Sequence, residues 1–127
     1  MSDAYATQRF HEGLRAFQAL EAPLREGLGR GVDAKKIDAV LIDLDAALPG
    51  LDGQERGRAL FFKAYVLDWR RIVEFSGKSV FEAIETPPDP RIDLALEALR
   101  QGRALLQDPD DIARADDLAK RLEAERR

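Results

Sequence analysis

Residues 53–75 contain no proline and, read with the 3.6-residue period of an α-helix, carry apolar side chains around most of the helix circumference. A helix that is apolar on nearly every side is stable in water only when other elements cover it. Asp52 and Glu55 have the spacing of a capping box at its start. We therefore expect this segment to be the buried, central helix of the chain. One narrow stripe is expected to stay in water, and it consists of Arg56, Lys63, Arg70 and Glu74.

The two segments before it are predicted to be amphipathic helices. The first has a single apolar face, which runs through Ala6, Phe10, Leu14, Phe17, Leu24 and Leu28. Pro23 interrupts this segment and predicts a kink or a short additional helix. Asp33 is the expected N-cap of the next helix, over residues 34–48, which Pro49 and Gly50 end.

Three more helices are predicted after the central one. Ser79 and Glu82 have capping-box spacing and predict a short helix to about residue 84, which the sequence Thr86-Pro87-Pro88 ends. Asp-Pro pairs at 89–90 and 108–109 predict the starts of helices over residues 90–107 and 109–126. No segment alternates as a strand does. Residues 1–127 are therefore expected to form one all-α domain of about six helices, arranged as an antiparallel bundle or a short array of helical hairpins.

Composition narrows the chemistry that such a domain can perform. The chain has no cysteine and one histidine, which excludes disulfides, thiolate chemistry and any site that needs two imidazoles. Phosphate-loop, dinucleotide, zinc-protease and calcium-loop motifs are each incomplete, so we expect no catalytic residue, cofactor or metal. The formal net charge of −4 argues against nucleic-acid binding, because free nucleic-acid binders are usually basic. No apolar run approaches the length of a membrane span, so no membrane partner is expected.

Two charged residues fall on the apolar side of the central segment. On a helical wheel Asp68 lies among apolar positions, and Arg58 lies between Tyr65 and Trp69. An unpaired buried carboxylate is costly, so Asp68 is expected to pair with a cation, and Arg71 is the local candidate. Two interpretations stay open: a buried ion pair, which we favour, or a polar spot in an aromatic binding pocket. The candidate pocket consists of Arg58, Phe61, Tyr65, Asp68 and Trp69.

Residues 57–90 carry a weak family pattern. Leu60, Ala64 and Leu67 have the large, small, large spacing of a first helix, and a second helix with a closing proline follows in Ser76, Val80, Ala83 and Pro88. This stretch resembles one repeat of the tetratricopeptide-repeat family. Lys63 stands where that family has an apolar residue, and the following stretch does not repeat the pattern. The resemblance implies a helical hairpin that binds partner proteins or peptides.

These observations favour a non-enzymatic interaction module, adaptor- or scaffold-like, over an enzyme. Its expected partner is another protein or peptide, or a second copy of the chain. The first helix, with Phe10, Phe17 and Leu24, is expected either to cap the core of its own chain or to dock on that second copy. Two alternatives stay open: a small-ligand-binding or carboxylate-using enzyme domain with a pocket near Asp68, and a nucleic-acid-associated protein that uses the stripe of Arg56, Lys63 and Arg70. No signal peptide is visible, which favours the cytoplasm, and the lack of asparagine beside abundant alanine, arginine and leucine suggests a bacterial source.

Overall fold

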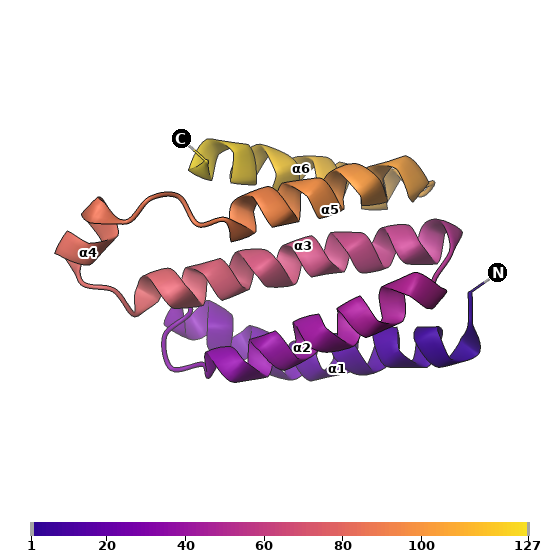
Figure 1. Cartoon of the computed structure of the whole chain (residues 1–127), viewed down its shortest axis with the longest axis horizontal. Coiled ribbons are helices and arrows are strands. Elements are labelled where there is room, and N and C mark those ends of the chain that lie inside the picture. Colours follow the sequence, from indigo (N-terminus) through magenta and orange to yellow (C-terminus); the bar gives the residue numbers. More distant parts are fainter. Residues whose placement is uncertain (1, 127) are drawn as a thin grey trace.

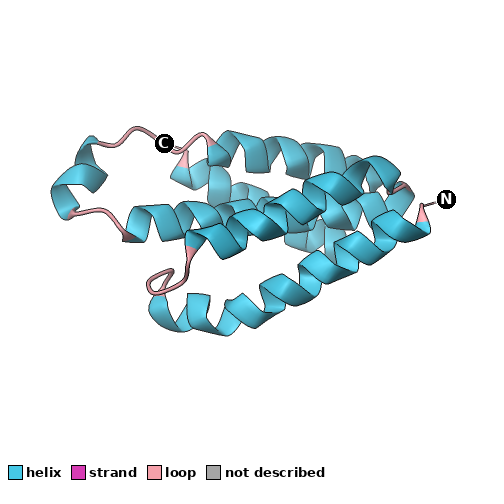
Figure 2. Cartoon of the chain, turned by 60° about the horizontal axis from the view of Figure 1, so that its bottom comes forward, coloured by secondary structure: helices cyan, strands magenta, loops and turns pink. Residues whose placement is uncertain are grey.

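The computed structural model describes residues 2–126, and every regular element in that range is a helix (Figure 2). In chain order the elements are α1 (Ala4–Gly27), α2 (Ala34–Ala47), the 3₁₀ helix η1 (Leu48–Gly50), α3 (Gly53–Ser76), α4 (Val80–Glu85), α5 (Arg91–Leu105) and α6 (Pro109–Glu125). The predicted all-α class and the six α-helices are confirmed within the described range.

Helix α3 is the central element, as its apolar circumference predicts. Figure 1 shows it between a layer formed by α1 and α2 and a layer formed by α5 and α6. Its most extensive interface is with α5, and it also contacts α1, α2 and α6. The outer helices pair with their chain neighbours, α1 with α2 and α5 with α6. The chain is therefore an antiparallel bundle built around α3.

Two glycines allow α3 and α5 to approach closely. A Cβ atom added to Gly57 would lie 3.1 Å from the carbonyl oxygen of Gly102, and one added to Gly102 would lie 3.0 Å from that of Gly57. Both distances are too short for an unstrained contact, so a side chain at either position would push the two helices apart. The largest interface of the bundle thus depends on two residues without side chains.

Helix α1 uses its apolar face to cover the bundle core. Phe10, Phe17 and Leu24 are buried, and the ring of Phe17 meets the edge of Phe62 at 5.6 Å and of Tyr65 at 5.8 Å between ring centroids. Of the two alternatives for this helix, the structure therefore bears out the first: its apolar face covers the core of its own chain and is not available to a second copy. Pro23 lies inside α1, which continues as one helix to Gly27 because Leu24, on the far side of the proline, is still anchored in the core.

The expectation of a solvated stripe on α3 is wrong for Arg56, Lys63 and Arg70, whereas Glu74 is exposed as predicted. Arg70 is only 9% exposed, and its guanidinium donates to Asp38 of α2 at 2.9 Å and to Glu74 at 3.0 Å. Lys63 pairs with Asp45 of α2 at 2.8 Å, and Arg56 donates to the carbonyl oxygen of Leu48 at 2.6 Å. Two carboxylates of α2, Asp38 and Asp45, pair with this stripe, whereas Asp43 pairs with Arg9 of α1. Arg70 and Lys63 therefore form a polar seam between α2 and α3.

The start of α3 also differs from the sequence prediction. Asp52 holds the N-cap position, but its side chain does not accept the capping hydrogen bond. Glu55 instead accepts a hydrogen bond from the hydroxyl of Thr7 in α1, at 2.8 Å. The carboxylate that the capping box required is thus used to join α3 to α1.

Candidate functional site

Asp68, the most unusual residue of the predicted pocket, lies in a buried ion-pair network. Its side chain is 2% exposed, and it accepts hydrogen bonds from Arg71 at 2.9 Å and from Arg121 of α6 at 2.6 Å. The predicted partnership with Arg71 is confirmed. Arg121 is a second partner, 53 residues away, which sequence spacing could not identify. Asp68 therefore ties α3 to α6.

The other charged residue of the predicted pocket also contacts α6. Arg58 donates from Nε to Asp111 at 2.8 Å, and its Nη2 lies 3.8 Å from Asp108. The hydrogen bond to Asp111 raises the pKa of the Arg58 guanidinium above its ordinary value. Arg58 thus reaches the first turn of α6, where Asp108 also caps the helix by accepting from the backbone of Asp110.

The aromatic residues of the predicted pocket make contacts other than those of Arg58 and Asp68. The hydroxyl of Tyr65 donates to Glu21 of α1 at 3.2 Å and accepts from Arg25 at 3.3 Å. Phe61 and Trp69 are partly buried against the core. The structure therefore directs Tyr65 towards α1, and it directs Arg58 and Asp68 towards α6. The charged and hydroxyl groups of the predicted pocket are thus engaged in contacts with different helices.

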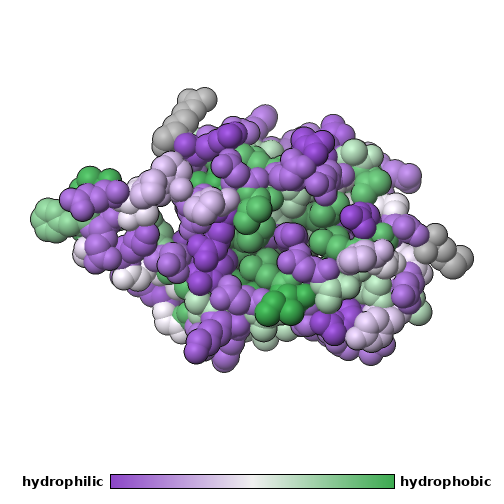
Figure 3. Space-filling model, in the orientation of Figure 1, coloured by the Kyte–Doolittle hydropathy of each residue, from purple (hydrophilic) through white to green (hydrophobic). Residues whose placement is uncertain are grey.

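A different region, at one end of the bundle, exposes the apolar surface that a binding site needs. Five large apolar side chains there are exposed, and we call this set the α4 patch; it consists of Leu28, Phe75, Val80, Phe81 and Ile84. Figure 3 shows apolar atoms at the outer tip of the molecule, where Figure 1 places α4. Large exposed apolar residues elsewhere, such as Ile42 and Leu94, lie on other helices.

Local signals explain why α4 forms and why it stays short. The Ser79 hydroxyl accepts from the backbone N–H of Glu82 at 3.2 Å, which caps the first turn. At the other end Thr86 donates to the carbonyl oxygen of Glu82 and accepts from Lys78 at 3.2 Å, and the two following prolines prevent continuation. No residue of α4 is buried, and it forms no extended interface with another described helix. Tertiary packing, which stabilises most protein helices, is therefore nearly absent from α4.

The α4 patch borders a groove, which we call the outer groove. Its volume is about 810 Å³, and it lies between α4, the end of α3 and the turn after α1; its apolar lining is Leu28, Ile72, Phe75, Val80, Ala83 and Ile84. Leu28 has a left-handed backbone conformation with φ 51°, which normally favours glycine or asparagine. This strained residue presents an exposed leucine at the edge of the groove. Charged side chains of Glu26, Arg30 and Lys78 complete its rim.

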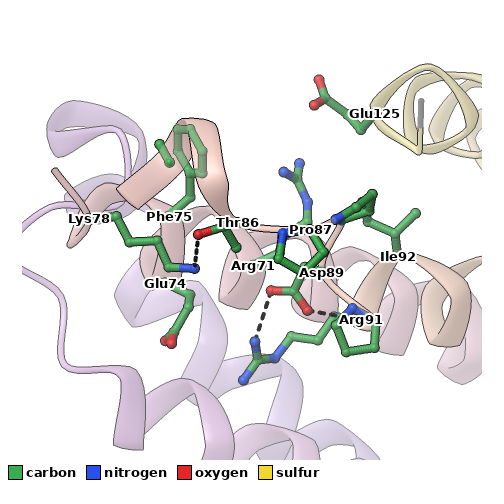
Figure 4. Close-up of a pocket in the computed structure, with 13 residues that line it drawn as sticks. Arg71, Glu74, Phe75, Lys78, Thr86, Pro87, Asp89, Arg91, Ile92 and Glu125 are labelled. Atoms are coloured by element: carbon green, nitrogen blue, oxygen red, sulfur yellow. Dashed lines mark hydrogen bonds and ion pairs between the residues drawn. The ribbon is translucent and has the colours of Figure 1, made fainter. Parts of the chain in front are cut away.

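A second hollow of about 790 Å³ lies between the end of α3, the linker after α4 and the start of α5. Figure 4 shows its charged lining, in which Arg91 pairs with Asp89 at 3.0 Å and Lys78 reaches Thr86. Arg71, on the same wall, is already bound to Asp68. Most polar groups of this hollow are thus paired, either with each other or with neighbouring residues such as Asp68, which makes the outer groove the better candidate for apolar recognition.

The carboxylates near the predicted pocket are engaged in ion pairs. Asp68, the carboxylate of the predicted pocket, is paired with Arg71 and Arg121, and Glu74 on the same helix is paired with Arg70. Over residues 2–126 no three side chains of the metal-binding types are grouped so that they could hold an ion. In the same range no helix has the length and apolar character needed to cross a membrane.

Comparisons with protein families, with curated proteins and with solved structures find no match for this chain.

Proposed function

We propose that this protein is a non-enzymatic protein-interaction module, adaptor- or scaffold-like, which binds an acidic, apolar helix of a partner in the outer groove. The observation that carries the proposal is the α4 patch: five large apolar side chains exposed together at one end, on and beside a helix that contributes nothing to the core. Single exposed apolar residues are normal, whereas a contiguous patch with a polar rim is typical of interaction sites.

The energetics favour burial of this patch by a partner. Removing a large aliphatic or aromatic side chain from water stabilises a complex by about 1.5–3 kcal/mol. Leu28 is the C-cap of α1, so its left-handed backbone ends that helix. Its side chain remains exposed and lines the outer groove, where a partner can cover it.

The rim of the outer groove supports an acidic partner. Arg30 and Lys78 lie on this rim, and neither has a carboxylate within ion-pair distance in residues 2–126. Glu26 is the single acidic residue of the lining. A partner helix with apolar side chains on one face and carboxylates beside them satisfies both the groove and its cations. The resemblance of residues 57–90 to the tetratricopeptide-repeat family supports the same class of function, since that family binds proteins and peptides.

A pair of designed helical peptides tests the proposal. Both carry leucines at i, i+3, i+4 and i+7; one has glutamates beside them and the other has lysines. We expect the acidic peptide to bind at least 10-fold more tightly than the basic one. Ile84→Ser should weaken its binding about 10-fold, which corresponds to about 1.4 kcal/mol. Leu94→Ser, which removes an exposed leucine from α5, is the matched control and should change nothing.

The measurement is fluorescence anisotropy of the labelled peptide, titrated with the folded protein. Absence of binding by the acidic peptide, or binding that Ile84→Ser leaves unchanged, would contradict the proposal.

A further inference from the structure

We infer that the occupant of the outer groove is α4 of a second copy of this chain, so that two copies join reciprocally at their α4 ends. This inference rests on the proposed function, since it names the partner helix. Phe81 provides the first reason. It projects from α4 with 79% of its surface exposed and is not part of the groove lining. The same end of one molecule therefore presents both a projecting aromatic side chain and an apolar groove.

In a two-fold symmetric dimer, the exposed Phe81 and the outer groove of each copy are both buried. In an isologous pair each copy inserts its own Phe81 into the other copy's groove, between Leu28 and Ile84. Figure 1 shows that α4 extends beyond the ends of the other helices, so two copies can approach end to end without collision of the bundles. Figure 2, turned by 60°, shows the same projection.

Charge provides the second reason. Helix α4 carries Glu82 and Glu85, and within residues 2–126 neither carboxylate is paired with a cation. The groove that receives this helix has the unpaired cations Arg30 and Lys78 on its rim. In the reciprocal pair the acidic helix of each copy meets the cationic rim of the other. Helix α4 thus has the chemistry proposed above for the partner, namely large apolar side chains flanked by carboxylates.

The size of the patch sets the expected strength of the pair. Interfaces below about 1,200 Å² in total are typical of weak and transient complexes. Five large side chains from each copy form a small interface of this kind, so we expect a dissociation constant on the order of 10 µM. The chain should be a monomer at low micromolar concentration and a dimer in the millimolar range.

Sedimentation velocity of the full chain, from about 1 µM to 1 mM, measures this equilibrium. The wild-type protein should dimerise, and Phe81→Ser should raise the dissociation constant at least 10-fold. Leu94→Ser, the matched control on α5, should dimerise like the wild type. All substituted side chains are exposed, and far-UV circular dichroism checks that each variant remains folded.

A charge exchange makes the test specific for the reciprocal arrangement. One variant carries Glu82→Lys and Glu85→Lys, and the other carries Arg30→Glu. Each alone should dimerise at least 10-fold more weakly than the wild type, because like charges face each other in both halves. An equimolar mixture should recover dimers within a few-fold of the wild-type affinity, since each helix then meets a rim of opposite net charge: Arg30→Glu makes the rim net negative, because Glu26 and the new carboxylate outweigh Lys78.

Three outcomes would overturn the inference: a wild-type chain that is monomeric at 1 mM, a dimer that Phe81→Ser does not weaken, or a mixture that fails to recover. The acidic peptide described above separates this failure from failure of the proposed function. If the wild-type chain is monomeric but binds the peptide, the second copy is wrong and the interaction module stands. If the chain neither dimerises nor binds the peptide, both proposals are wrong.

Discussion

The body of the bundle and its α4 end each contain phenylalanine side chains, which are buried or partly buried in the body and exposed at the α4 end. Phe17 of α1 is completely buried, and its ring packs edge-on against two other aromatic rings. Phe81 of α4 is 79% exposed. The difference follows from the helices that carry them, because α1 has 24 residues and lies along the bundle, whereas α4 has six and projects beyond it. Apolar character in one region stabilises the fold, and in the other it remains available for binding.

The charged residues of the two regions also differ, in whether they have partners. In the bundle body they form ion pairs: Asp68 pairs with two arginines, Arg70 with two carboxylates, and Arg58 with Asp111. Burial alone would lower the pKa of Arg70, yet its hydrogen bonds to Glu74 and Asp38 raise that pKa above the ordinary value. At the α4 end Arg30, Glu82 and Glu85 have no such partners in residues 2–126. The α4 end therefore has both unpaired charges and exposed apolar surface.

The largest effect should come from removing the buried aromatic ring. We expect Phe17→Ala to lower the free energy of unfolding by about 3–5 kcal/mol, because it deletes a fully enclosed side chain and leaves a cavity. Urea denaturation followed by circular dichroism measures the change. Phe75→Ala, in the α4 patch, is the matched control and should cost far less. Equal losses for the two variants would remove the distinction between the regions.

A smaller loss is expected from the buried carboxylate. Asp68→Asn leaves Arg71 and Arg121 without their anion, which in a fully buried pair costs about 3–5 kcal/mol. The side chain of Arg121 is 58% exposed and can be hydrated, so we expect about 2–3 kcal/mol.

Arg121→Gln is the control for this variant. It should cost less than Asp68→Asn, because Asp68 keeps Arg71 as a partner. A neutral Asp68→Asn would mean that the network does not stabilise the bundle body.

The exposed ion pair between Glu97 and Arg100 on α5 should have the smallest effect on stability among these changes, but its effect on the pKa of Glu97 can be measured. Hydrogen bonds from Arg100 and Gln101 lower the pKa of Glu97 from 4.5 to about 2. Because the folded-state pKa is depressed, the contribution to stability is present above the unfolded-state pKa and is lost as the pH falls through about 2. NMR titration of the Glu97 carboxyl should show its pKa rising towards 4.5 in Arg100→Gln. A pKa that does not move would show that Arg100 is not the cause.

Much of the fold could be predicted from the sequence because local physics determines it. Side-chain caps at Asp33, Ser79 and Asp108 form as the sequence indicates. The continuous apolar circumference of residues 53–75 predicted the central helix correctly, since no other environment suits such a segment. Asp68 on the apolar side predicted an ion pair, and its (i, i+3) partner Arg71 was within reach of helical periodicity.

The contacts that could not be predicted from the sequence depend on which helices pack side by side. A helical wheel shows that Arg70 is polar but cannot show that α2 will cover it with Asp38. Arg121 reaches Asp68 only through the packing of α6 beside α3. The α4 site did leave a signal in the sequence: three large apolar residues, Val80, Phe81 and Ile84, in a segment too short to bury them. That signal becomes interpretable only once α4 is seen to project from the bundle.

The most direct test of the distinction between the two regions is the free energy of unfolding of Phe81→Ser, measured beside the wild type at about 1 µM, where both are expected to be monomers. Substitutions of exposed side chains away from structural contacts usually change stability by less than about 0.5 kcal/mol. We expect this result, because Phe81 contributes to association and not to the core. A loss of about 2 kcal/mol or more would place Phe81 in the folded core and would contradict the assignment of the α4 patch to binding.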